Sequence, residues 1–77
     1  MEESVAITKI QEFLGQSMRL SIKDGRTFTG RFMTTDRDAN IILQGSEEAR
    51  GPETRFVGMV CVPGREIIRI EICKDRF

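Results

Sequence analysis

Two carboxylates separated by one residue, Asp36 and Asp38, are the side chains whose types and spacing first suggest chemistry. Paired carboxylates can divide acid–base work in an active site. The chain has no histidine, however, which removes most zinc sites and any Ser-His or Cys-His nucleophile pair. With Arg37 between them in a polar turn, the two aspartates more simply bond to the backbone. We therefore expect no catalytic residue and no metal site.

The two cysteines, Cys61 and Cys73, lie twelve residues apart in apolar stretches that resemble strands. This spacing does not fit a metal knuckle, and free cysteine usually behaves as a small buried apolar residue. We expect two buried or half-buried reduced thiols, as in a cytoplasmic protein. An acidic start, with Glu2 and Glu3, does not fit a secretory signal, and no apolar run reaches membrane length.

The length and charge of the chain point to a small domain that depends on a partner. Its 77 residues suggest one domain with a thin core, which a bound partner would stabilise. Twelve basic and twelve acidic residues give zero formal charge, whereas nucleic-acid binders usually carry a basic excess. Composition therefore weakens a nucleic-acid function without excluding it.

The elements that must position these residues are a short helix and five strands. Ile7, Ile10 and Leu14 recur at helical spacing, which predicts an α-helix over about 4–14. From Met18 the period changes to two, which predicts a strand over about 18–23, and Asp24-Gly25 predicts a hairpin. The returning strand, about 26–35, contains Gly30, and an interior glycine indicates a bend or a close backbone approach.

The second half of the sequence predicts three more strands around one loop. They are expected over about 40–44, 55–62 and 66–72, and the polar segment 45–54 is expected to be an exposed, mobile loop. Pro63-Gly64 predicts a tight turn before the last strand. Five strands joined by tight turns behind one helix predict an all-β fold, a small five-stranded antiparallel barrel or sandwich.

The order of these motifs resembles the Sm/Lsm family. Asp24-Gly25-Arg26, Gly30, and then Asp36 followed by Asn40 with Ile41-Ile42-Leu43 match its first signature, and the last two strands take the place of the second. The resemblance implies a strongly bent Sm-like barrel whose fourth and fifth strands pair with neighbouring subunits in a ring. In RNA-binding members, an aromatic or planar side chain two residues before the asparagine stacks on a base. An Arg-Gly pair in the second signature completes that pocket.

This sequence departs from the RNA-binding pattern at two positions. Asp38 stands where the base would stack, and Pro63-Gly64 replaces the Arg-Gly pair. Stacking contributes about 1–3 kcal/mol per base, whereas a carboxylate repels RNA. Of the usual pocket only Asn40 and Gly64 remain, and Asn40 could instead bond to its own turn.

The same two departures make the chain similar to the Lsm-domain auxiliary subunits of NatC N-terminal acetyltransferases. The resemblance implies a cytoplasmic, ribosome-associated role without catalysis, in which the chain is bound to a large helical scaffold subunit and a catalytic subunit. Acetyl-CoA is then expected only on the catalytic subunit, and the substrates are nascent chains that begin with Met and a bulky apolar residue. The alternative is an Lsm ring subunit that binds U-rich or A-rich RNA.

The segment Arg55–Val60 approaches the acetyl-CoA motif Arg/Gln-x-x-Gly-x-Gly/Ala but ends in valine. That motif opens a helix, where backbone N–H groups hold the pyrophosphate, whereas strand-like residues follow here. We therefore do not expect this chain to be the acetyltransferase itself.

The fourth predicted strand is apolar on both faces. Strict alternation would put Phe56, Val60 and Val62 on one face and Val57, Met59 and Cys61 on the other. An edge strand of this kind needs a cover, from the helix or loop of the same chain or from a partner. We predict a partner surface that contains Val57, Met59 and Cys61. Ile67, which faces away from the predicted core stripe Ile68, Ile70 and Ile72, is a further candidate.

Overall fold

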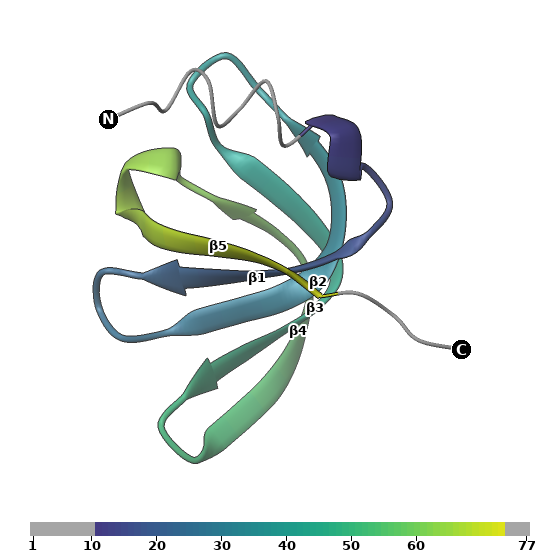
Figure 1. Ribbon diagram of the computed structural model, residues 1–77. Helices are drawn as coiled ribbons and strands as arrows, with labels where there is room; N and C mark the ends of the chain where they lie inside the picture. Colours follow the sequence, from purple (N-terminus) through teal and green to yellow (C-terminus); the bar gives the residue numbers. More distant parts are fainter. Residues whose placement is uncertain (1–10, 74–77) are drawn as a thin grey trace.

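The computed structural model describes residues 11–73, which form one antiparallel five-stranded sheet (Figure 1). Its strands are β1 (Ser17–Ile22), β2 (Thr27–Thr35), β3 (Ile41–Arg50), β4 (Glu53–Val62) and β5 (Ile67–Cys73). They lie in the order β4-β3-β2-β1-β5. The expected all-β fold of five antiparallel strands is confirmed. Because β4 and β5 are the two ends of this order, the barrel remains open between them.

The predicted helix over about 4–14 falls mainly outside the described residues. Its described part is a single 3-10 turn, η1 (Gln11–Phe13), in which Phe13 packs against the core. The 3-10 turn is followed by Gly15, whose φ is 84°, and the Gly15 N–H donates to the carbonyl of Phe32 at 2.8 Å. This bond attaches the entry of β1 to the middle of β2.

The core lies on one face of the sheet. Its buried members come from β1 to β4 and are Met18, Leu20, Ile22, Phe28, Phe32, Ile41, Leu43 and Val62. In β1 the alternation predicted from the sequence is realised, because Met18, Leu20 and Ile22 are buried while Arg19 is exposed. A core of this size gives the domain only a small free energy of unfolding.

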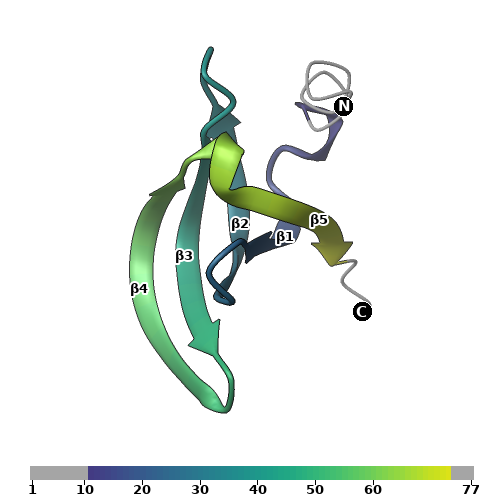
Figure 2. The same cartoon turned by 90° about the vertical axis from the view of Figure 1, so that its left-hand side faces the viewer.

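The expected mobile loop over 45–54 is wrong. β3 continues to Arg50 and β4 begins at Glu53, so that only Gly51-Pro52 forms the turn of a long hairpin. The polar residues of this segment have weak strand propensity, but β3 still pairs with β2 as far as Ala49 and with β4 as far as Arg50. Figure 2 shows β3 and β4 as a long pair that curves away from the other strands.

The bend of the sheet is centred on Gly30, Ser46 and Gly58, on three adjacent strands. The β2–β3 and β3–β4 registers both shift around Ser46, which marks β-bulges. Ser46 is fully buried, and its hydroxyl donates to the carbonyl of Gly58. The bend predicted from Gly30 is thus present, since bulges increase the local twist and curvature of a sheet.

Candidate functional site

The turn between β2 and β3 is organised by the carboxylate of Asp36. Its Oδ1 accepts hydrogen bonds from the backbone N–H of Asp38 at 2.9 Å and of Asn40 at 3.0 Å. Its Oδ2 accepts one from the side-chain amide of Asn40, also at 3.0 Å. These bonds, that from the Asn40 side chain above all, hold the pKa of Asp36 below its usual value. Asp36 therefore shapes the turn, as the sequence suggested, and Asp38 is left exposed.

The two signature turns meet through Asn40 and Gly64. The Oδ1 of Asn40 accepts a hydrogen bond from the backbone N–H of Gly64 at 3.3 Å. A Cβ at position 64 would overlap the carbonyl oxygen of Ala39, so only glycine fits against this turn. Asp38, Asn40, Pro63 and Gly64, the four positions at which the sequence predicts an altered RNA pocket, are thus on neighbouring turns. The Oδ1 and the Nδ2 of Asn40 each have a partner within the chain.

The hydrogen bonds of Asn40 hold these two turns together. At the two positions that depart from the RNA-binding pattern, the chain has the exposed carboxylate of Asp38 and the ring of Pro63. Proline offers neither a side-chain donor nor a backbone N–H. Within residues 11–73, no cluster of three His, Cys, Asp or Glu side chains could hold a metal ion.

The fourth strand does not follow the strict alternation expected from the sequence. Ser46 pairs with Gly58 and Glu47 pairs with Phe56, so that Val57 is the extra residue of a bulge. Gly58 permits this with a φ of 78°. As a result Val57 packs against the core together with Val60, whereas Phe56 is 70% exposed. The predicted faces of Phe56 and Val57 are therefore interchanged.

The predicted partner surface is divided by this bulge and by a second one in β5. Met59 is 67% exposed and Cys61 is exposed, as a contact surface requires. Val57 and Ile67 instead pack against the core. Ile67 pairs with Ile22 across a register shift in the β1–β5 ladder, which leaves Ile68 64% exposed and corrects the predicted core stripe.

Sequence reasoning missed Phe56 as a surface residue. The signal that could have found it is Gly58, because an interior strand glycine often marks a bulge that reverses the alternation. Cys61 and Cys73 were both expected to be buried or half-buried free thiols. Both are free, but Cys61 is exposed, whereas Cys73 is half-buried.

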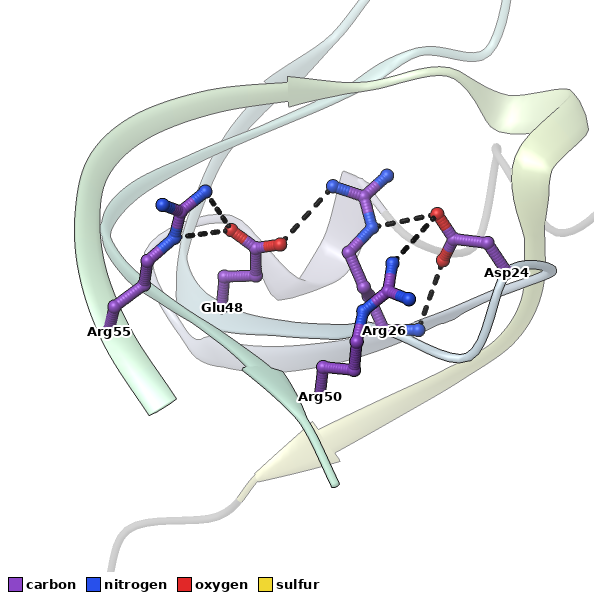
Figure 3. A network of polar contacts seen from close by, with 5 residues as sticks. All are labelled: Asp24, Arg26, Glu48, Arg50 and Arg55. Carbon is purple, nitrogen blue, oxygen red and sulfur yellow. Dashed lines mark hydrogen bonds and ion pairs between the residues drawn. The ribbon is translucent and has the colours of Figure 1, made fainter. Parts of the chain in front are cut away.

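A chain of ion pairs joins the β3–β4 hairpin to the β1–β2 hairpin (Figure 3). Glu48 is at its centre: Oε1 accepts from Nε of Arg55 at 2.9 Å, and Oε2 accepts from Nη1 of Arg26 at 3.3 Å. Arg26 also donates from Nε to Asp24 at 2.8 Å, and Arg50 lies 3.7 Å from the same Asp24 oxygen. Hydrogen bonding, first from Arg55, holds the pKa of Glu48 below its usual value. This network is centred within the segment expected to be a loop and links it to the β1–β2 hairpin.

The open, bent five-stranded sheet with its two joined signature turns defines an Sm-type domain. The LSM domain model matches residues 8–72, and the chain belongs to the LSM domain family. No helix of the described part of the chain is long and apolar enough to cross a membrane.

Curated relatives carry a narrower description. The chain is 38% identical over 77 residues to "N-alpha-acetyltransferase 38, NatC auxiliary subunit" of Danio rerio, with 90% of this chain and 70% of the relative covered. It is 46% identical over 66 residues to the protein of the same description in Drosophila melanogaster, with 83% of this chain and 54% of the relative covered. The chain thus spans between about half and about two thirds of these relatives.

Solved structures agree with the sequence comparison. A chain in the crystal structure of the NatC complex bound to CoA superimposes with a TM-score of 0.77 at 31% identity, with 84% of both chains covered. A Pyrococcus abyssii Sm protein in complex with a uridine heptamer gives a TM-score of 0.78 at 22% identity, covering 86% of this chain and 94% of that one. The second likeness concerns the fold alone.

Proposed function

We propose that this protein is a non-catalytic auxiliary subunit of a NatC-type N-terminal acetyltransferase, where it binds the large helical scaffold subunit. The observation that carries the proposal is the agreement between the altered pocket and the relatives. Asp38 and Pro63 stand where the RNA-binding pattern has groups that hold a base, and the curated relatives at 38% and 46% identity are described as NatC auxiliary subunits.

The position of Arg55–Val60 supports a role without catalysis. This segment lies within β4, and the guanidinium of Arg55 is bonded to Glu48. The element after β4 is η2 (Gly64–Glu66), a single 3-10 turn that is too short to offer a helix N-terminus to a pyrophosphate. Acetyl-CoA in this proposal binds to the catalytic subunit, and the present chain stabilises or positions its partners.

The proposal extends to substrate and location. The complex would act in the cytoplasm, at or near the ribosome, on nascent chains that start with Met and a bulky apolar residue. The barrel contributes to this activity through the assembly of the complex and not through contact with the acetyl group.

Co-expression tests the proposal directly. The chain is expressed with the scaffold and catalytic subunits of NatC from the same organism, and the complex is isolated through a tag on the scaffold. We expect the chain to elute in the complex and to show no binding to oligo(U) by itself. Oligo(U) binding whose affinity falls steeply as salt rises, with no recovery of the chain in the complex, would favour the RNA-binding ring instead.

A further inference from the structure

The outer face of the sheet carries an apolar patch that the core does not use. β3 pairs Ile42 with Cys61 of β4 and with Thr34 of β2, all on the face opposite the buried Leu43. Around this row are Met33 at 40% exposure, Met59 at 67% and Phe56 at 70%. The name outer patch is used below for Met33, Ile42, Phe56, Met59 and Cys61.

The outer patch is continuous along β4 because of Gly58. The bulge at this residue turns Phe56 to the same face as Met59, and the Phe56 ring lies beside Gly58, with Cε2 3.8 Å from where a Cβ of that glycine would be. Aromatic residues and methionine are enriched in the cores of protein interfaces. The outer patch therefore has the character of an interaction site, because large apolar side chains that gather on a surface usually mark one.

We infer that the outer patch receives an amphipathic α-helix of the partner, laid along β4; this inference rests on the proposed function. At its Ile42–Cys61 end the patch extends over three strands, which at the usual spacing makes it about 10 Å wide there, close to the diameter of a helix. Its length from Phe56 to Cys61 is about 15 Å, which corresponds to about three helical turns.

Two other occupants fit less well. A strand added to the free edge of β4 would leave Met33 and Ile42 uncovered, because they lie on β2 and β3. A second copy of the chain that docked through the same patch would contribute only these five side chains, whereas a stable interface involves about 20–30 residues a side. A helix that belongs to a larger scaffold makes its remaining contacts elsewhere.

The charge at the rim defines the partner helix further. Glu47 pairs with Phe56 in the β3–β4 register, is exposed, and forms no ion pair within residues 11–73. Arg31, which pairs with Gln44 in the β2–β3 register, donates from Nη1 to the carbonyl of Gly15 at 2.8 Å. The helix therefore combines an apolar face of Leu, Met or Phe with a Lys or Arg that reaches Glu47.

Binding to the co-expressed scaffold and catalytic subunits tests the inference with Phe56→Asp and Met59→Asp. We expect each to weaken the complex at least about 30-fold, because interface anchors contribute about 2 kcal/mol or more. Ile68→Asp on β5 is the matched control, since Ile68 is 64% exposed, and it should bind as the unmodified chain does. A thermal melt of each variant alone shows that the barrel is folded.

The outcomes separate the two proposals. If the unmodified chain does not bind these subunits, the proposed function is wrong, and so is the inference of a partner helix that rests on it. If the chain binds but the two patch variants bind equally well, only the outer patch is wrong. The helix is tested by a photo-cross-linking residue at position 56 or 59. Cross-links three or four residues apart on one scaffold helix are expected, whereas alternate residues of an extended segment, or a second copy of the chain, would refute it.

Discussion

Gly30 on β2 lies so close to Ser46 on β3 that no side chain fits between them. A Cβ at position 30 would come within 2.7 Å of the Cβ of Ser46 and 3.0 Å of its Cα. Ser46 is in turn hydrogen-bonded through its hydroxyl to Gly58 of β4. The sheet can therefore bend over three strands because two of them present only hydrogen at the point of closest approach.

Gly30→Ala should destabilise the protein, since the new methyl group meets backbone that cannot move away without flattening the bend. Overpacking of this kind costs about 2 kcal/mol, which lowers the melting temperature by about 10 °C in a domain of this size. Thermal unfolding followed by circular dichroism measures the change. Thr29→Ala, one residue away on the same strand, is the control. The double variant with Ser46→Gly should recover part of the loss, and an unchanged Gly30→Ala would contradict the close approach.

The sequence predicted the sheet well where alternation was regular and failed where a bulge interrupted it. Met18, Leu20 and Ile22 could be assigned to the core because β1 has a strict period of two. Phe56 and Val57 could not, because the positive φ of Gly58 reverses the faces in the middle of β4. Likewise, the hairpin over 45–54 is formed by pairing between strands and carries the Arg26–Glu48–Arg55 network, neither of which local composition reveals.

The candidate site, too, could be predicted from the sequence only in part. The departure from the RNA-binding pattern was visible in the types of two residues, Asp38 and Pro63. The sequence could not show that Asn40 joins the two turns. Asn40 and Gly64 are 24 positions apart in the chain, and only the fold brings the Asn40 side chain to the Gly64 N–H. Sequence patterns identify substituted positions, but contacts between distant turns emerge only from the fold.

Replacing Asn40 tests whether its remaining role is structural. Asn40→Ala removes the acceptor of the Gly64 N–H and the donor to Asp36, so we expect a loss of about 1–2 kcal/mol in the free energy of unfolding. Urea denaturation of the isolated chain measures it. Asp38→Ala is the control, because the Asp38 side chain is exposed and its replacement should change stability by less than about 0.5 kcal/mol. Equal effects of the two substitutions would show that Asn40 does not hold the turns together.

The Glu48 network should make the long hairpin sensitive to acid. Because hydrogen bonds from Arg55 and Arg26 lower the pKa of Glu48 in the folded protein, its stabilising effect is complete above the ordinary glutamate pKa. The effect is lost as the pH falls through the lowered value. The stability difference between the unmodified protein and Glu48→Gln should therefore be present at about pH 7 and shrink at about pH 3.

Chemical denaturation of both proteins over this pH range measures that difference. Hydrogen exchange at neutral pH should also be faster in the hairpin of Glu48→Gln, at residues 47–56. Glu47→Gln is the matched control, because Glu47 is exposed and forms no ion pair within residues 11–73, so its replacement should change the stability by less than about 0.5 kcal/mol. A difference for Glu48→Gln that stays constant from neutral to acid pH would mean that the ion pairs do not stabilise the hairpin.

The interchange of Phe56 and Val57 separates stability from assembly at two adjacent positions. Val57 packs against the core, so Val57→Ala should destabilise the isolated chain by about 1 kcal/mol. Phe56 is 70% exposed, so Phe56→Ala should change the stability by less than about 0.5 kcal/mol although a larger side chain is removed. In the complex the order should reverse, with Phe56→Ala weakening association more than Val57→Ala. Denaturation of the free chain measures the stability, and affinity for the scaffold measures the association. Strict alternation along β4 predicts instead that Phe56→Ala destabilises the chain more and that Val57→Ala weakens association more.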